Sequence, residues 1–351
     1  MQGSDRGCER TFHCVLLVLR RNNPGSLAGK QLFPIKIGAC NLPAILLDVQ
    51  VIDLTVDAAQ GYQRLSAGLR EAGLDPANLF DWDASRSPYP GLPAFQERDA
   101  AVYFGRDGEI REVMETLSRQ RLLGGRRLLL ILGASGSGKS SLVRAGVVPR
   151  LKRRENQWLV IDPFRPLDRP MDEVALAIDN TFRSFNDIRD WKSIRDRLLC
   201  VLDKNDFTPL LDLANDLRST SGQREASILL VIDQFEELLG YDDEHPAHSF
   251  LRLLRVILEA LATPYIAVAT LRSDFLQLLQ LTEEIKDLAP ELRLISQLPL
   301  ADFAQVIEGP ARVAGLELRP GLAQAMIVDA ATDDALPLLA FTLRELWERY
   351  G

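Results

Sequence analysis

The sequence predicts an α/β fold in which a parallel sheet is covered by helices on both faces. Three observations lead to this prediction. Strand-like and helix-like segments alternate through residues 96–300, a glycine-rich loop follows the apolar run Leu128–Leu132, and an aspartate ends the apolar run Ile228–Asp233. Such alternation is typical of parallel sheets with right-handed helical crossovers. We therefore expect a three-layer domain with its ligand site at the carboxyl edge of the sheet.

The first block of the chain, residues 1–80, is predicted to be an incomplete α/β piece. It has strand-like runs at Val15–Leu19, Leu32–Ile37 and Val49–Leu54, followed by a helical pattern from Asp57. Runs that are apolar at nearly every position favour a parallel sheet, but a block this short is marginal for an independent core. We interpret it as the tail of a larger domain. Residues 81–95 contain three prolines and a glycine and are predicted to be a linker.

The second and third blocks are predicted to form the main domain and a small helical addition. Five strand candidates occur in residues 96–300: Leu128–Leu132, Trp158–Asp162, Ile228–Asp233, Tyr265–Leu271 and Leu294–Leu298. Residues 301–351 have helical periodicity only, with one apolar stripe formed by Leu339, Leu343, Leu346 and Trp347. We expect a helical lid or the start of a winged-helix region there.

The composition narrows the functional class. The 351 residues include 41 basic and 49 acidic side chains, so the net charge of −8 argues against general nucleic-acid binding. Four cysteines without a C-x-x-C pair indicate reduced thiols. The apolar run Phe12–Leu19 is far shorter than the roughly 20 residues that cross a bilayer, and no signal-peptide cleavage site follows it. We expect a cytoplasmic protein without membrane association.

The glycine-rich loop has the G-x-x-x-x-G-K-[ST] spacing of a phosphate-binding loop, from Gly133 to Ser140. Its glycines let the backbone bring several N–H groups to a phosphate, and the helix that follows presents its positive N-terminal end to the same anion. Lys139 can reach the β- and γ-phosphates, and Ser140 can bind Mg²⁺. The residues predicted to bind nucleotide here are Gly133, Ser135, Gly136, Ser137, Gly138, Lys139, Ser140 and Ser141.

Two further strand ends are predicted to complete the site. Asp233 ends an apolar strand, where its carboxylate can hold Mg²⁺ together with Ser140; the alternative is that Asp233 caps the next helix. Arg272 follows the strand Tyr265–Leu271 and is predicted to contact the γ-phosphate. The alternative is an ordinary surface ion pair between Arg272 and Asp274.

These motifs, together with others in the same order, resemble the novel STAND NTPase 1 group of bacterial signal-transduction NTPases. The resemblance covers roughly residues 87–351. Besides the loop, the matching segments are Ser87-Pro-Tyr-Pro-Gly-Leu-Pro-Ala-Phe95, Tyr103-Phe-Gly-Arg-Asp-Gly-Glu109, Asp233-Gln-Phe-Glu-Glu237, Thr270-Leu-Arg-Ser-Asp-Phe275, Ile307-Glu-Gly-Pro-Ala311 and Leu336-Pro-Leu-Leu339. The resemblance implies a P-loop NTPase core of the additional-strand class with a C-terminal helical lid.

The resemblance also implies ligands and partners. It assigns Phe104, Gly105 and Arg106 to the base side of ATP or ADP, and Pro337 to a nucleotide contact from the lid, although Ala335 stands where that motif prefers glycine. ADP would hold the lid closed, and exchange for ATP would open it and permit self-association, which requires that the nucleotide bind two states with different affinities. Protein partners would bind through flanking domains.

The water-activating group is left open by the sequence. ATPases of the additional-strand class usually carry a glutamate directly after the metal-binding aspartate, but this chain has Gln234 there. Glu236 or Glu237 can act as the general base if the turn directs one of them inward. Alternatively, Gln234 only orients water, which implies slow hydrolysis. At least one of the two glutamates is expected in solvent in the first turn of a helix.

Residues 30–75 resemble the C-terminal part of a TIR domain. The matching segments are Gly29-Lys-Gln-Leu-Phe-Pro-Ile-Lys-Ile37, Leu42-Pro43, Asp48-Val-Gln-Val-Ile-Asp-Leu54 and Gly61-Tyr-Gln-Arg-Leu65. Cys14–Arg21 falls where TIR domains carry a glutamate-bearing helix but contains no acid, so NAD⁺ cleavage is not expected. We interpret this block as a truncated TIR-like domain.

The leading hypothesis is therefore an ATP- and ADP-binding switch with slow hydrolysis. A second hypothesis is an interaction scaffold that binds ATP without hydrolysing it, which Gln234 favours. A third is a P-loop enzyme acting on a small substrate, such as a kinase.

Overall fold

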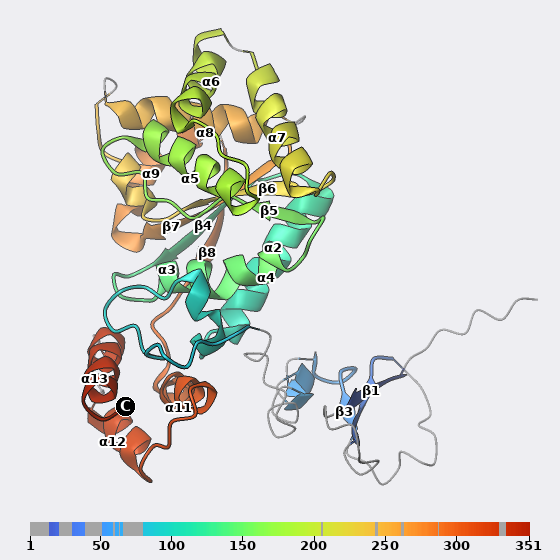
Figure 1. Ribbon diagram of the computed structural model, residues 1–351, viewed down its shortest axis with the longest axis vertical. Coiled ribbons are helices and arrows are strands. Elements are labelled where there is room, and N and C mark those ends of the chain that lie inside the picture. The colour runs from blue at the N-terminus through green and yellow to red at the C-terminus, as the bar shows by residue number, and fades with distance from the viewer. Residues whose placement is uncertain are drawn as a thin grey trace, which may run out of the picture. The chain divides into compact units, whose positions relative to one another are not determined.

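The computed structural model describes residues 14–20, 30–38, 51–58, 60–62, 64–65, 80–204, 206–242, 245–260, 263–286, 288–329 and 335–351. The chain divides into two compact units, Met1–Asp81 and Trp82–Gly351 (Figure 1).

The N-terminal unit contains a small mixed sheet. Its strands β1 (Cys14–Arg20), β2 (Lys30–Lys36) and β3 (Ile52–Asp53) lie in the order β1-β2-β3. β2 and β3 are parallel, as expected, but β1 and β2 are antiparallel, so the prediction of a purely parallel sheet is wrong here. The nine-residue connection 21–29 explains the difference, because a parallel crossover needs a dozen or more residues. The stretch compared with a TIR helix is strand β1, and residues 39–50 lie outside the described residues.

The second unit is built on a five-stranded parallel sheet, which confirms the predicted α/β architecture. Its strands are β4 (Leu128–Gly133), β5 (Trp158–Val160), β6 (Ser227–Ile232), β7 (Tyr265–Arg272) and β8 (Glu291–Leu294). They lie in the order β5-β6-β7-β4-β8. β7 thus lies between β4 and β6. The glycine-rich loop after β4, Arg272 at the end of β7 and Asp233 after β6 therefore lie at the ends of three neighbouring strands.

Helices cover both faces of this sheet, which explains why β4, β6 and β7 are buried at nearly every position. On β4, Leu128 and Leu130 face one hydrophobic cluster, whereas Leu129 and Ile131 face another. The first cluster is completed by α5 (Pro170–Ser184), α6 (Trp191–Lys204), α7 (Thr208–Ser221) and α8 (Pro246–Glu259) (Figure 1). The second is completed by α2 (Asp107–Leu123) and by the helical segment that follows the glycine-rich loop.

The segment after the loop is helical from Lys139 to Lys152. It consists of α3 (Lys139–Ser141), a wider π-type stretch Leu142–Val147, and α4 (Val148–Lys152). The other short helical segments of the described part of this unit are η3 (Glu97–Val102), η5 (Phe235–Leu238), η6 (Ser273–Phe275), α9 (Leu276–Leu281), α10 (Glu283–Lys286) and η7 (Leu300–Asp302).

The fifth predicted strand, Leu294–Leu298, is displaced in the structure. β8 ends at Leu294, and residues 295–299 leave the sheet toward the C-terminal helices. Apolarity misled the prediction because β8 is an edge strand, on which Leu292 and Leu294 remain exposed. Ile295 and Leu298 are apolar for another reason, since each is buried in a different hydrophobic cluster.

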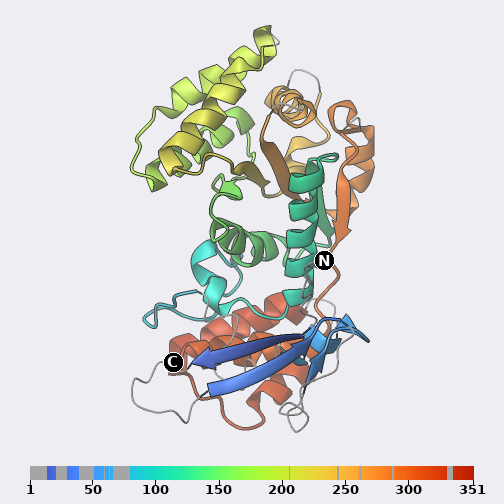
Figure 2. The same ribbon diagram turned by 90° about the vertical axis from the view of Figure 1, so that its right-hand side faces the viewer.

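Three C-terminal helices gather at one end of the second unit, drawn in red in Figure 2. They are α11 (Phe303–Val313), α12 (Leu322–Asp329) and α13 (Ala335–Tyr350). Leu339 and Leu343, from the predicted apolar stripe, are buried with Phe303 and Ile307, while Leu346 and Trp347 are half-buried. Tyr89 joins the same cluster, so the segment predicted to be a linker packs against these helices.

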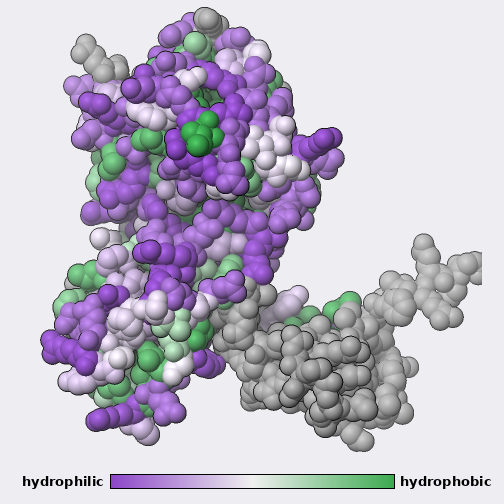
Figure 3. All heavy atoms as spheres, in the orientation of Figure 1, coloured by the Kyte–Doolittle hydropathy of each residue, from purple (hydrophilic) through white to green (hydrophobic). Residues whose placement is uncertain are grey.

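The face of the second unit drawn in Figure 3 is mainly hydrophilic, with small scattered apolar areas. Within the described residues, no helix combines the length and the apolar character needed to cross a membrane.

Candidate functional site

A cavity of about 380 Å³ opens at the carboxyl ends of β4, β6 and β7. One wall is the glycine-rich loop, a second is the segment Tyr89–Phe95, and a third is the start of α13. Eleven of the predicted site residues line it: Phe104, Arg106, Ser135, Gly136, Gly138, Lys139, Ser140, Ser141, Glu236, Arg272 and Pro337.

The loop has the backbone shape that its glycines allow. Gly136 and Gly138 take left-handed φ values of +75° and +86°, which residues with a Cβ rarely adopt. A Cβ at Gly133 would lie 2.7 Å from both the Ile295 carbonyl oxygen and Ser137 Oγ. No Cβ of Gly136 or Gly138 covers the loop backbone on the cavity side, whereas Gly133 is closely packed on the other side. This exposed backbone gives a phosphate group room to approach the loop N–H groups.

Lys139 lies along the loop. Its Nζ donates hydrogen bonds to the carbonyl oxygens of Gly133 at 2.9 Å and Ala134 at 2.7 Å. Burial lowers the pKa of Lys139, and the nearby carboxylate of Glu236 opposes this shift. A phosphate in the cavity would offer the ammonium group a stronger partner than two neutral carbonyls.

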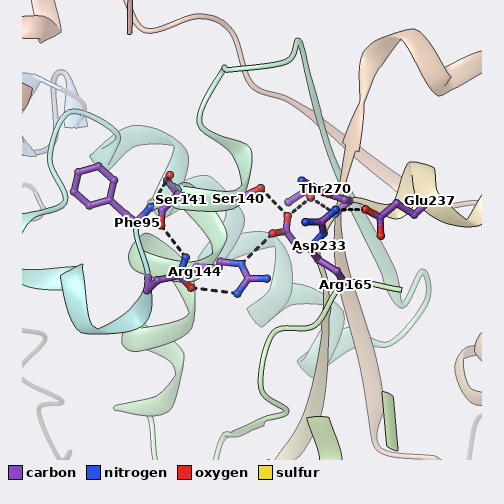
Figure 4. Close-up of polar contacts among 11 residues, drawn as sticks. Phe95, Ser140, Ser141, Arg144, Arg165, Asp233, Glu237 and Thr270 are labelled. Atoms are coloured by element: carbon purple, nitrogen blue, oxygen red, sulfur yellow. Dashed lines mark hydrogen bonds and ion pairs between the residues drawn. The ribbon is translucent and has the colours of Figure 1, made fainter. Parts of the chain in front are cut away.

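Asp233 is buried beside the loop, and its carboxylate accepts hydrogen bonds from three side chains (Figure 4). Its Oδ1 accepts hydrogen bonds from Ser140 Oγ at 2.7 Å and Thr270 Oγ1 at 2.6 Å, and its Oδ2 accepts one from Arg144 Nε at 3.0 Å. Ser140 and Asp233 thus present adjacent oxygens, the donor type that Mg²⁺ prefers. Among the described residues, no cluster of three or more His, Cys, Asp or Glu side chains offers another metal site.

The two candidate glutamates are placed differently. Glu236 lines the cavity, and its Oε2 accepts a hydrogen bond of 3.3 Å from the backbone N–H of Arg272. Glu237 is absent from the cavity lining; it forms an ion pair with Arg165 (Figure 4) and accepts a 3.0 Å hydrogen bond from the Leu167 N–H. Only Glu236 therefore faces the space where a nucleotide would lie.

Gln234, directly after Asp233, also lines the cavity. Its backbone takes the left-handed conformation, with φ of 59° and ψ of 56°, and its N–H donates to Thr270 Oγ1 at 2.9 Å. This strained conformation turns the chain sharply and allows Glu236, two residues later, to face the cavity.

Arg272 lines the cavity and pairs with Asp274. Arg272 Nε lies 3.1 Å from Asp274 Oδ1, and Arg272 Nη2 lies 2.6 Å from Asp274 Oδ2. The hydrogen bond from Arg272 lowers the pKa of Asp274, while that to Asp274 raises the pKa of Arg272. The surface ion pair considered from the sequence is therefore present, on a residue that also borders the cavity.

The residues predicted at the base side have mixed environments. Phe104 lines the cavity and packs on Gly309 of α11, where a Cβ would lie 2.6 Å from the ring. Gly105 packs against Val306 of the same helix instead of lining the cavity. Arg106 is buried, pairs with Glu109, and donates to the carbonyl oxygens of Ser137 at 3.0 Å and Ser296 at 2.9 Å. Its guanidinium thus holds the protein backbone around the site.

Ser137 and Gly133, also predicted to bind nucleotide, do not line the cavity. Ser137 Oγ is buried without a hydrogen-bond partner. Both residues pack against each other on the side of the loop away from the cavity.

Sequence reasoning assigned no individual role in the site to Tyr89, Phe95, Arg144 or Thr270. Tyr89 Oη donates to the Ile307 carbonyl oxygen at 2.6 Å, and the Phe95 N–H donates to Ser141 Oγ at 3.1 Å. Tyr89, Phe95 and Thr270 lie in the family motifs that begin at Ser87 and Thr270, and these motifs could have pointed to them. Arg144 lay outside every quoted motif.

The comparison with protein families matches most of the second unit. The sequence model of the Novel STAND NTPase 1 family matches residues 88–351. No curated protein is significantly similar to this chain in sequence.

Three solved structures are similar to this chain at low sequence identity. The ADP form of the ORC2 protein of Aeropyrum pernix has a TM-score of 0.50 and 14% identity, covering 70% of this chain and 64% of that protein. The Walker-type ATPase of Pyrococcus abyssi has a TM-score of 0.49 and 19% identity, covering 74% and 71% of the two chains. AMPPCP-bound DnaA of Aquifex aeolicus has a TM-score of 0.41 and 15% identity, covering 74% and 66%. This chain therefore spans less than two-thirds of the ORC2 protein's length.

Proposed function

This chain belongs to the Novel STAND NTPase 1 family, and we propose that it is an ATP- and ADP-binding switch that hydrolyses ATP slowly. The family match supports a nucleotide-binding NTPase. The proposal adds that bound nucleotide sets the arrangement of the C-terminal helices and, through it, self-association.

The observation that carries the proposal is the contact between α13 and the glycine-rich loop. A Cβ at Gly136 would lie 3.3 Å from Pro337 Cγ, and a Cβ at Gly138 would lie 4.0 Å from Leu336 Cδ2. The loop and α13 therefore border one cavity, so a ligand there touches both parts. A ligand with different affinities for two arrangements of these parts shifts the population between them.

The side chains around the cavity support phosphate chemistry. The loop N–H groups and Lys139 can bind the phosphates, and Ser140 and Asp233 can hold Mg²⁺. Mg²⁺ bound there would neutralise phosphate charge. Glu236 is the best-placed residue to accept a proton from an attacking water, since it borders the cavity and Glu237 does not. Arg272 can contact the γ-phosphate after leaving Asp274.

A non-hydrolysing scaffold is the second candidate. Gln234 supports it, because the position directly after Asp233 carries an amide and not a carboxylate. An amide can orient water through hydrogen bonds but cannot take up its proton at neutral pH.

The test of hydrolysis is ADP release from ATP by the full chain with Mg²⁺, beside a Lys139→Ala variant. Release that is lost in the variant supports the ATPase. Intact ATP after long incubation, with ATP binding retained, supports the scaffold and contradicts the slow ATPase.

The test of the switch compares the ADP-bound and ATP-bound chain by hydrodynamic size and by limited proteolysis around α13. We expect a difference between the two nucleotides in the unmodified chain and a smaller one in Pro337→Ala. Identical behaviour with both nucleotides would contradict the switch even if ATP is hydrolysed.

Several predictions from the sequence stay predictions. They are the truncated TIR-like domain, partners bound through flanking domains, a cytoplasmic location and the lack of general nucleic-acid binding.

A further inference from the structure

Arg144 contacts the candidate site through Asp233, but the function proposed above gives this charged residue no role. It follows Ser140 by four residues, so the helix after the loop presents both side chains on one face, toward Asp233. Its Nε donates to Asp233 Oδ2 at 3.0 Å (Figure 4), and its side chain is 17% exposed against 7% for Asp233.

The guanidinium is also held from its other side. Arg144 Nη1 donates to Gln96 Oε1 at 3.2 Å, and Gln96 Nε2 donates to the Ala94 carbonyl oxygen at 2.7 Å. Ala94 lines the cavity. Arg144 is therefore fixed between Asp233 and the cavity wall, with little freedom to turn into solvent.

The two oxygens of Asp233 have different partners. Oδ1 faces the hydroxyl groups of Ser140 and Thr270, which are neutral donors, whereas Oδ2 faces the positive charge of Arg144. A buried carboxylate near bound phosphates repels them unless a cation offsets its charge. In most such sites that cation is the metal ion, but here an arginine already occupies one oxygen.

We propose that Arg144 offsets the charge of Asp233, so that the site holds a nucleoside diphosphate without needing Mg²⁺. This inference rests on the proposed nucleotide-binding function. It adds that ADP binds without Mg²⁺, whereas ATP brings a metal ion with it. Oδ1 accepts only from neutral hydroxyl groups, so it is the oxygen that a metal ion arriving with a triphosphate would approach, beside Ser140 Oγ. Arg144 is a positioning residue here, since it acts through Asp233.

The experiment measures the affinity of the full chain for ADP by calorimetry, once with Mg²⁺ and once with EDTA. For the unmodified chain we expect the two dissociation constants to agree within about threefold. For Arg144→Gln we expect the affinity in EDTA to fall by about tenfold or more, and Mg²⁺ to restore most of it.

A matched control removes an arginine from another buried aspartate. Arg183 Nε lies 2.7 Å from Asp179 Oδ2 on α5, and Asp179 is buried like Asp233. Arg183→Gln should leave the ratio of the two ADP affinities unchanged. In an Asp233→Asn background, adding Arg144→Gln should cost no further affinity in EDTA, because the charge to be offset is gone.

The outcomes separate the inference from the proposed function. Loss of ADP affinity by tenfold when Mg²⁺ is removed from the unmodified chain overturns the inference, and this result needs no folded variant. An Arg144→Gln protein that binds ADP equally with Mg²⁺ and with EDTA also overturns it. No binding of ADP or ATP under either condition overturns the proposed function itself, and with it the inference.

Discussion

Arg272 and Asp274 hold each other through two hydrogen bonds at the border of the cavity, Nε to Oδ1 at 3.1 Å and Nη2 to Oδ2 at 2.6 Å. The paired geometry matches the planar fork of a guanidinium, which binds a carboxylate and a phosphate in the same way. On the proposed assignment of Arg272 to the γ-phosphate, Asp274 would compete with that phosphate for the same donor groups.

Removing this competition should favour ATP. In Asp274→Asn, Arg272 keeps its charge and loses its anionic partner, so we expect ATP to bind about two- to fivefold tighter while ADP affinity stays the same. Calorimetric titration with a non-hydrolysable ATP analogue and with ADP measures both. An equal gain for ADP would show that Arg272 does not respond to the γ-phosphate. Glu259→Gln, which removes a negative charge from an exposed pair with Arg255 on α8, serves as a control for altered surface charge.

The two neighbouring glutamates should differ in function. Glu236→Gln should slow ATP hydrolysis by about 100-fold or more, the usual contribution of a general base, with nucleotide affinity little changed. Glu237→Gln should hydrolyse ATP at nearly the unmodified rate, because Glu237 is held by Arg165 and the Leu167 N–H outside the cavity. Single-turnover rates of ADP formation measure both variants. Equal slowing in the two would contradict the assignment. No slowing in Glu236→Gln would mean that Glu236 is not the general base, and would favour the alternative in which Gln234 only orients the attacking water.

Nucleotide binding should weaken at alkaline pH through Lys139. Burial lowers the pKa of this residue below the ordinary 10.5, so its positive charge is lost at a lower pH than in an exposed lysine. A phosphate prefers the protonated amine, so ADP affinity should fall as the pH rises toward that pKa. In Lys139→Arg the charge persists at these pH values, and the fall should disappear. ADP affinity measured between about pH 7 and pH 10 tests this. An identical pH profile in the variant would contradict it.

The hydroxyl of Tyr89 should contribute to stability. It is buried and donates to the Ile307 carbonyl oxygen at 2.6 Å, which joins the segment before η3 to α11. Tyr89→Phe removes only this bond, so we expect the free energy of unfolding to fall by about 1 kcal/mol. Urea unfolding measures it, with Tyr350→Phe as the control because Tyr350 is 81% exposed. An unchanged midpoint would mean that the bond adds nothing to stability.

Much of the fold was predictable because its signals are local. The largely apolar segments Leu128–Leu132 and Ile228–Asp233 were predicted to be buried strands, and the structure has β4 and β6 there. The predicted strand Leu294–Leu298 was wrong because apolar residues occur there in two different environments. The apolar residues after Glu291 include exposed positions of an edge strand and buried positions of the following segment, and no periodicity separates these. The antiparallel pairing of β1 and β2 was missed because apolar runs do not report strand direction.

The candidate site was predictable to the extent that it depends on spacing along the chain. The loop from Gly133 to Ser140 is contiguous, so its shape follows from its own glycines. The sequence could not show which of Glu236 and Glu237 lines the cavity. Glu237 is held outside it by an ion pair with Arg165, which lies some seventy residues earlier in the chain. The roles of Tyr89 and Phe95 were missed for the same reason, since their partners are Ile307 and Ser141.

The sequence by itself determined the class of the second unit: a parallel α/β sheet, a glycine-rich loop with the spacing typical of phosphate binding, and an aspartate and an arginine at two further strand ends. These features depend on residues close together in the chain, where backbone geometry and burial leave few alternatives. Only the tertiary structure decided which side chains share the cavity and how Asp233 is held by Ser140, Thr270 and Arg144. Such contacts join segments up to about ninety residues apart. Their geometry is set by the packing of the whole domain, and no local pattern encodes it.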